Sequence, residues 1–290
     1  MGETTPTVRC DGAFRGSDAV AAGLLTAAQL RGPQVQRLFN GVYAFADVPR
    51  THQLYCEGAA LIMPPAAVLT GRSAATVRGT QLAWPDDPVE LAVPTSSRIA
   101  RRRGLDVRRT ELHPAEWTCW HGIGLATPLR TALDLLLDRS LPDAVADLDA
   151  FVRARAVDLP TVRRLVAERS DHGIITARRA AALADPRAES RPESRMRVWL
   201  ALDGLYPEPQ FWIDDDRGRL ARVDLAFAEH RLAVEYDGSW REEPWALNRD
   251  RDRLNRVHDA GWAVVFVTAP LLRDPRRMVQ TVRSALARTR

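Results

Sequence analysis

Two runs of residues with the alternation of β-strands lie close together in the C-terminal third of the chain. Residues 222–228 place Val, Leu and Phe at alternate positions, and residues 232–236 read Leu-Ala-Val-Glu-Tyr. A short polar turn over residues 228–231 joins them, so the pattern predicts two adjacent strands. Further along, it predicts a helix over residues 245–260, an apolar strand over residues 262–268 and a final helix with Met278, Val279, Val282 and Leu286 on its buried face.

Acidic residues stand in both of these neighbouring strands. Asp224 lies in the first strand, and Glu235 and Asp237 lie at the end of the second. Both strands are apolar and an unpaired buried charge is costly, so we expect a cation between the carboxylates. Carboxylates, water and a substrate phosphate are typical ligands of Mg²⁺. We therefore predict that Asp224 and Glu235 bind Mg²⁺ or Mn²⁺; the alternative is a pair of solvent-facing charges on an edge hairpin.

Two helices flank these strands and carry further charged residues. The helix before the strands has Glu193 in its first turn, where the helix dipole favours a carboxylate. Glu193 either has only that role or adds an acid to the metal shell. In the helix after the strands, Arg249, Arg253 and Arg256 recur at positions i, i+4 and i+7 and form one exposed stripe. An arginine stripe beside a metal site suits the phosphates of DNA.

The N-terminal region carries signals for three short helices followed by a strand. Ser17 is a candidate N-cap for the first helix, a second helix is predicted over residues 27–31, and a third is predicted over Pro33–Phe39. A strand over residues 42–45 follows, and this order is typical of a winged helix-turn-helix over residues 15–50. The side chains of the third helix expected to face the DNA major groove are Gln34, Gln36, Arg37 and Asn40. The alternative is a helical cap that packs on the rest of the protein.

Two strands in the middle of the chain are separated by a cationic loop. The strands are predicted at residues 89–93 and 105–109, and the loop holds Arg98 and the run Arg101-Arg102-Arg103. A charge run of this kind either lies along a phosphate backbone or forms a solvated turn, and the pattern leaves both interpretations open.

Length and composition predict several domains. With 290 residues, of which 46% are hydrophobic, the chain can form two or three globular domains. The expected fold class is α+β and multi-domain. In order, we expect a winged helix-turn-helix over residues 15–50, a mixed strand and helical region over 51–184, a linker over 185–192 and a restriction-endonuclease-like α/β core over 193–290.

Charge and cysteine content limit the chemistry. The net charge of +4 and the pI near 9.4 are compatible with a polyanionic partner. All 41 basic residues are arginine, which binds phosphate bidentately, so a mechanism that needs a catalytic lysine is excluded. Three widely spaced cysteines predict neither a disulfide framework nor a zinc site. We see no membrane span or signal peptide, and expect a cytoplasmic location.

Five short motifs between residues 190 and 269 are informative together. They are Ser-Arg-Pro-Glu193, Arg-Val-Asp224, Ala-Val-Glu235-Tyr-Asp237-Gly238, Asp250-Arg-Asp-Arg-Leu-Asn255 and Ala-Gly-Trp262. This stretch resembles the very-short-patch-repair-like endonuclease family of the PD-(D/E)XK superfamily. The resemblance implies a metal-dependent phosphodiesterase core with Asp224 and Glu235 as ligands. Two positions depart from the pattern: Asp237 stands where the superfamily usually has lysine, and Trp240-Arg241 stands where a histidine often follows the Asp-Gly turn.

A second set of motifs lies between residues 17 and 79. It comprises Gly23-Leu-Leu-Thr26, Gln29-Leu30, Gly41-Val-Tyr43 and Ser73-Ala-Ala75. This region looks like the N-terminal winged-helix part of the type IV abortive-infection antitoxin family. The resemblance implies DNA binding by the N-terminal region.

The expected function is that of a metal-dependent DNA endonuclease with an N-terminal DNA-binding domain. Asp237 would orient or deprotonate the attacking water, and Arg249 or Arg253 would hold the phosphate. The alternative is a DNA-binding transcriptional regulator or antitoxin-like protein whose nuclease fold is inert. The expected partner is DNA, with no membrane and no organic cofactor, and a homodimer fits either function.

Overall fold

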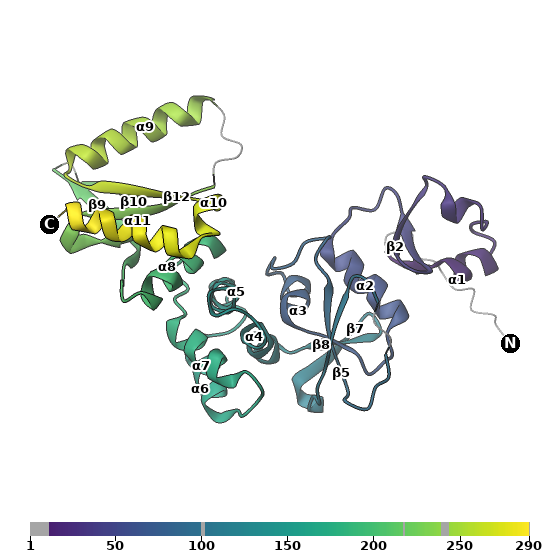
Figure 1. The fold of residues 1–290 in the computed structure, drawn as a ribbon. Coiled ribbons are helices and arrows are strands. Elements are labelled where there is room, and N and C mark those ends of the chain that lie inside the picture. Colours follow the sequence, from purple (N-terminus) through teal and green to yellow (C-terminus); the bar gives the residue numbers. More distant parts are fainter. Residues whose placement is uncertain (1–11, 100–101, 217, 239–243, 290) are drawn as a thin grey trace. The chain divides into compact units, whose positions relative to one another are not determined.

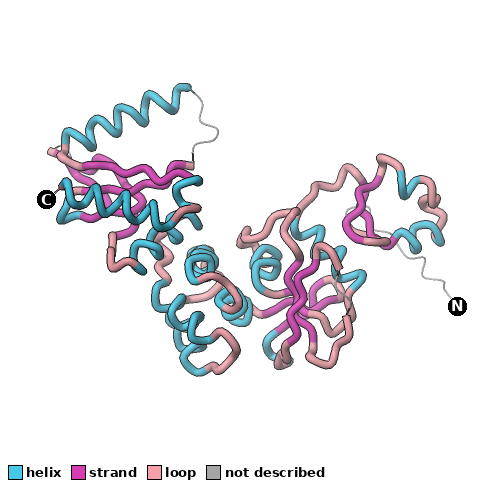
Figure 2. The backbone as a smooth tube through the Cα atoms, in the orientation of Figure 1, coloured by secondary structure: helices cyan, strands magenta, loops and turns pink. Residues whose placement is uncertain are grey.

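A computed structural model describes residues 12–99, 102–216, 218–238 and 244–289, and within residues 244–251 the description covers the backbone alone. The chain divides into two units, Met1–Leu135 and Leu136–Arg290 (Figure 1). Helices and strands occur in both units (Figure 2), which confirms the expected α+β class. Among the described helices, none combines the length and the hydrophobicity needed to cross a membrane.

The N-terminal part of the first unit is a small three-stranded sheet with one short helix. Its elements are β1 (Phe14–Arg15), α1 (Gly16–Ala21), the 3-10 turn η1 (Gln29–Arg31), β2 (Val35–Phe39) and β3 (Val42–Phe45), and the strand order is β1-β3-β2. The expected third helix over Pro33–Phe39 is therefore wrong. Asn40-Gly41 is the two-residue turn of a β-hairpin, with Gly41 at φ 78, and not the end of a helix. Because an Asn-Gly pair favours both features, the competing strand preference of Val35, Leu38 and Phe39 decides the outcome.

The rest of the first unit is built on a five-stranded sheet. Its elements are α2 (His52–Ile62), β4 (Val68–Leu69), α3 (Gly71–Val77), β5 (Val89–Val93), β6 (Leu105–Arg109), β7 (Trp117–Trp120), β8 (Ile123–Ala126) and α4 (Pro128–Leu136), with strand order β6-β5-β4-β8-β7. The predicted strands at residues 89–93 and 105–109 are confirmed as β5 and β6. Buried residues of β2, β3, α2 and this sheet form one hydrophobic core, so the small sheet packs on α2.

The second unit begins with four helices. They are α5 (Leu141–Arg153), α6 (Leu159–Glu168), α7 (Ile174–Leu183) and α8 (Arg191–Leu202). Carboxylates buried between α5 and α8 are satisfied by arginines and hydroxyls. Asp149 accepts hydrogen bonds from Arg197 Nη2 (2.8 Å), Ser194 Oγ (2.7 Å) and Asp185 N (2.7 Å). The expected linker over residues 185–192 thus lies inside this unit, where Ala188 is buried.

A four-stranded sheet completes the second unit. Its elements are β9 (Glu208–Asp215), β10 (Gly218–Phe227), the turn η3 (Ala228–His230), β11 (Leu232–Asp237), α9 (Pro244–Asp259), β12 (Ala263–Thr268), α10 (Ala269–Leu272) and α11 (Pro275–Arg288). The strand order is β12-β11-β10-β9, with β11 and β12 parallel and the other pairs antiparallel. The two strands predicted from alternation are β10 and β11, and β9 was not expected.

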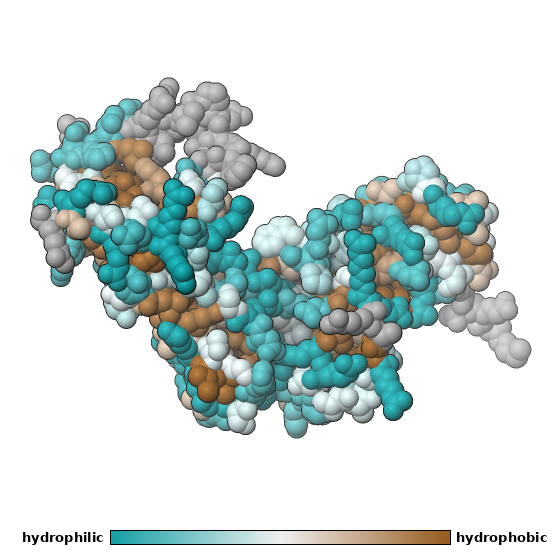
Figure 3. All heavy atoms as spheres, in the orientation of Figure 1, coloured by the Kyte–Doolittle hydropathy of each residue, from teal (hydrophilic) through white to brown (hydrophobic). Residues whose placement is uncertain are grey.

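Helices cover both faces of this sheet. Met196 and Leu200 of α8 and Met278 of α11 pack with Val234 on one face. Val257 of α9 packs with β-strand residues on the other, and Figure 1 shows α9 and α11 on opposite sides of the strands. Figure 3 shows hydrophilic residues over most of the face in view and hydrophobic residues in smaller patches.

The buried ion pair between α5 and α8 predicts a large effect on stability. Arg197→Leu would leave Asp149, whose side chain is 2% exposed, without its guanidinium, and is expected to lower the free energy of unfolding by about 3–5 kcal/mol. Urea unfolding measures the effect. The double variant Asp149→Leu with Arg197→Leu is the control, because it removes both charges and should lose less than the single variant. A double variant less stable than the single one would contradict this account.

Candidate functional site

The register of the C-terminal sheet brings Asp224 and Glu235 together. Leu225 of β10 lies opposite Val234 of β11, so the preceding residue, Asp224, lies beside Glu235 on the same face. On its other side, Val223 and Leu225 pair with Phe211 and Pro209 of β9. Asp224 therefore sits in the sheet between Gln210 and Glu235.

Asp224 is a partly buried carboxyl group with acidic neighbours. Its Oδ2 accepts a hydrogen bond from the backbone N–H of Tyr236 at 2.8 Å. The pKa of Asp224 is raised to about 6, mainly by burial and also by the charges of Glu193 and Glu235, while the Tyr236 N–H and Arg253 lower it. A carboxyl with this balance gains from any added cation.

Glu193 approaches this pair from the start of α8. The side chain of Ser190 caps the helix at the Glu193 N–H (3.3 Å). Glu193 is 6% exposed, and its Oε2 accepts hydrogen bonds from Glu189 N and Gln210 Nε2, both at 2.8 Å. Glu193 therefore lies in the first turn of the helix and also beside the carboxylates of the strands, so its position is compatible with both roles expected from the sequence. Gln210 was missed because β9 itself was not predicted.

Glu235 is occupied by an arginine from α9. Arg253 Nη1 and Nη2 donate to Glu235 Oε1 and Oε2 at 3.0 and 2.9 Å, a bidentate pair. The Glu235 side chain is 13% exposed and that of Arg253 is 32% exposed. The arginine expected to hold a DNA phosphate thus binds a candidate metal ligand in this structure. A metal ion at Glu235 would have to share these two oxygens with the guanidinium or displace it.

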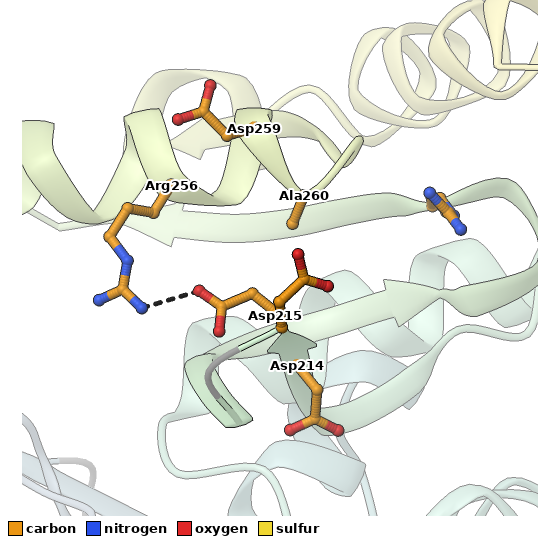
Figure 4. Close-up of a pocket in the computed structure, with 7 residues that line it drawn as sticks. Asp214, Asp215, Arg256, Asp259 and Ala260 are labelled. Atoms are coloured by element: carbon orange, nitrogen blue, oxygen red, sulfur yellow. Dashed lines mark hydrogen bonds and ion pairs between the residues drawn. The ribbon is translucent and has the colours of Figure 1, made fainter.

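Arg256, one turn further along α9, lies in a different pocket. It donates to Asp215 Oδ2 at 2.8 Å, and Figure 4 shows the two side chains pointing toward each other while the Asp214 carboxylate points away. The pocket has a volume of about 550 Å³ and is also lined by Asp216, Arg231, Asp259 and Ala260. Arg253 and Arg256 therefore face different carboxylates. The side chain of Arg249 lies outside the described residues.

Asp237 ends β11 opposite Thr268 of β12. It lies two positions after Glu235, so the strand period puts both on the same face. Among the described residues, however, no group of three or more histidine, cysteine, aspartate or glutamate side chains lies in an arrangement that could hold a metal ion. The expected convergence of Asp224, Glu235 and Asp237 on one ion is not found there.

The N-terminal residues expected to read DNA lie on a hairpin and not on a helix. Gln36 Nε2 donates to the carbonyl oxygens of Phe45 (3.0 Å) and Val48 (2.6 Å) and is therefore engaged within the hairpin. Arg37 Nη2 donates to Asn40 Oδ1 at 2.6 Å. Gln34 precedes the strand, and its carbonyl accepts from Ala46 N at 2.9 Å. These four residues belong to β2 and its flanking turns.

Comparison with known proteins gives relatives in one organism. No family model matches the chain. "Uncharacterized protein MT2308" and "Uncharacterized protein Rv2248", from two strains of Mycobacterium tuberculosis, are each 36% identical over 209 residues, which cover 71% of this chain and 73% of theirs. Among solved structures, the RV2827C protein from Mycobacterium tuberculosis is 16% identical with a TM-score of 0.38, covering 69% of this chain and 79% of that one. By its identity and coverage, the chain belongs to the family of Rv2248 and MT2308.

Proposed function

We propose that the protein is a metal-dependent DNA endonuclease of the PD-(D/E)XK type. The observation that carries the proposal is the group formed by Glu193, Asp224 and Glu235, whose charges act on one another within one sheet and its flanking helix. Carboxylates gathered in this way are costly unless a cation balances them. The order of α8, three strands, α9, β12 and α11 supports the same proposal.

The donor atoms of this group suit a divalent cation such as Mg²⁺ or Mn²⁺. Among the described residues, Asp224 Oδ1 and Glu193 Oε1 have no hydrogen-bond partner, since the hydrogen bonds of both groups use the other oxygen. Hard oxygen ligands of this kind are those that Mg²⁺ prefers. Asp224 and Glu235 would hold the ion, with Glu193 beside them. A bound ion would lower the pKa of a water ligand and neutralise charge on the phosphate.

The remaining residues would act on the water and the phosphate. Asp237, on the same strand face as Glu235, would orient or deprotonate the attacking water. Arg253 would leave Glu235 and bind the phosphate, and Arg249 and Arg256 would extend the cationic surface along the strand. In this exchange the positive charge of Arg253 is paired first with the Glu235 carboxylate and then with the phosphate.

The N-terminal sheet supports the DNA-binding part of the proposal. Its elements run strand, helix, 3-10 turn, then a hairpin, which keeps the hairpin of a winged helix but has a strand where the recognition helix would stand. In this proposal the β2–β3 hairpin, with Arg37 and Asn40, is the wing. Contacts from a wing go mainly to the backbone of the duplex.

One observation favours a second function. The Arg253–Glu235 pair already neutralises a required metal ligand, and Asp237 stands where the superfamily usually has lysine. Both features suit a DNA-binding regulator or antitoxin-like protein with an inert nuclease fold. Metal binding separates the two functions, because the inert protein has no use for the ion.

A substitution at Glu235 tests the enzyme. Glu235→Gln keeps the shape of the side chain and removes its charge, so it should weaken Mn²⁺ affinity at least about tenfold and abolish plasmid nicking with Mg²⁺ or Mn²⁺. Calorimetry and a nicking assay measure the two effects. Asp215→Asn, which also removes the partner of an α9 arginine, is the matched control and should change neither. Equal Mn²⁺ affinity in wild type and Glu235→Gln would rule out this site.

The raised pKa of Asp224 predicts a pH-dependent stability. The group titrates at about 6 in the folded protein against 3.8 for an ordinary aspartate, so the folded state holds an extra proton between these values. Its contribution to the free energy of unfolding therefore falls as pH rises through this window and stays low above it.

Asp224→Asn is expected to stabilise the protein at about pH 7.5 and to have little effect near pH 4, where the carboxyl is already protonated. Urea unfolding at both pH values measures this. Added Mg²⁺ should stabilise the wild type at the higher pH and leave the variant unchanged. An equal gain at both pH values would show that the effect comes from packing and not from charge.

A further inference from the structure

A second charged site lies entirely within the first unit. It is a pocket of about 800 Å³ between the β2–β3 turn, α2 and the segment that precedes β6. Its charged and aromatic lining consists of Arg37, Arg50, Arg102, Arg103, Asp86, Asp87, Phe39 and Tyr55. We call it the arginine pocket. Four arginines and two aspartates give it a net charge of +2.

The arginines of this pocket are held differently from the buried arginines elsewhere in the described residues. In the described part of the chain, none of the four makes a salt bridge, whereas Arg130, Arg191 and Arg197 of other regions each pair with a buried aspartate. Like charges gathered in a concave site repel one another more strongly than on an open surface, because less water screens them. The arrangement is therefore stabilised when an anion enters.

Neutral groups hold two of these arginines in position. Arg37 donates to Asn40 Oδ1 at 2.6 Å and to the Phe39 carbonyl at 3.3 Å. Arg50 donates to the Tyr55 hydroxyl and lies 5.7 Å from the centre of its ring. These partners orient the guanidinium groups without forming a salt bridge, and Asp86 acts on Arg50 only through its charge. Arg102 and Arg103 are exposed and belong to the cationic loop seen in the sequence.

We propose that the arginine pocket binds a phosphate group of a nucleic-acid strand. Guanidinium groups bind phosphate oxygens bidentately. Several guanidinium groups around one site suit a phosphodiester, whose two free oxygens can be contacted from more than one side, better than they suit a carboxylate. Asp86 and Asp87 on the wall repel a second phosphate nearby, so the pocket takes one backbone phosphate and the strand continues past the rim. The inference rests on the proposed DNA-binding function of the N-terminal unit, and is independent of cleavage.

The test is binding of a labelled 12-nucleotide DNA, single-stranded and as a duplex, followed by fluorescence anisotropy over a series of salt concentrations. The double variant Arg102→Gln with Arg103→Gln should weaken binding about tenfold at low salt and reduce the salt slope by about 1, because a phosphate contact is lost. The control is Arg276→Gln with Arg277→Gln, which removes two exposed charges from α11 of the second unit. The control should keep the wild-type slope.

All measurements use the full chain without metal, so that cleavage plays no part. Unchanged affinity and slope in the pocket variant would overturn the proposal, and so would equal losses in the pocket and control variants, because these indicate general attraction to a cationic protein. A wild type that binds DNA through the pocket but nicks no plasmid would refute the endonuclease and leave this site standing. The two sites are also separated if the Glu235→Gln variant loses nicking activity but binds DNA with the same affinity and salt slope as the wild type.

Discussion

Every buried carboxylate in this chain must be balanced by arginine or by polar hydrogens, because the chain has no lysine. Asp134 pairs with Arg130 and Arg108, Asp147 with Arg191, and Asp149 with Arg197. Removing one partner of such a pair leaves a charge in a poorly hydrated place, which costs far more than the pair contributes. These contacts therefore fix how helices such as α5 and α8 pack, and they position the start of α8 where Glu193 meets the sheet.

Glu193 and Asp224 differ from these carboxylates because neither has an arginine partner of its own among the described residues, and the candidate site follows from that difference. The charges of Glu193 and Glu235 act on Asp224, whose direct hydrogen bond comes from a backbone N–H. Arg253 supplies one positive charge to a site with three carboxylates, and it does so through Glu235. One guanidinium supplies a single positive charge against three carboxylates, which is the observation on which the proposed cation site rests. Arg253 therefore matters to both proposed functions: in the enzyme it would leave Glu235 for the phosphate, and in the inert protein it would stay paired with Glu235.

The sequence predicted the adjacent strands β10 and β11 well, because alternation and a short turn are local signals. That Asp224 and Glu235 lie next to each other follows from the pairing of these two strands alone. The contact of Gln210 with Glu193 depends on β9. In this strand Gln210 has a φ of 55, and buried and exposed residues do not alternate regularly, so the sequence pattern did not predict it. The Arg253–Glu235 bond joins residues 18 positions apart through tertiary packing, which no periodicity reveals. In the N-terminal region, Asn40-Gly41 suited both a helix end and a hairpin, and local signals favoured the wrong one.

The two candidate sites differ in how their arginines are used, and this difference bears on how each would bind a phosphate. In the C-terminal site the guanidinium of Arg253 is engaged by Glu235, so a phosphate must compete with a carboxylate to reach it. In the arginine pocket Arg37 and Arg50 are held by neutral hydrogen-bond partners, and in the part of the chain that the structure describes a phosphate has no salt bridge to break there. If both sites bind phosphate as proposed, the pocket therefore binds it without first breaking an ion pair, whereas Arg253 must exchange one anion for another.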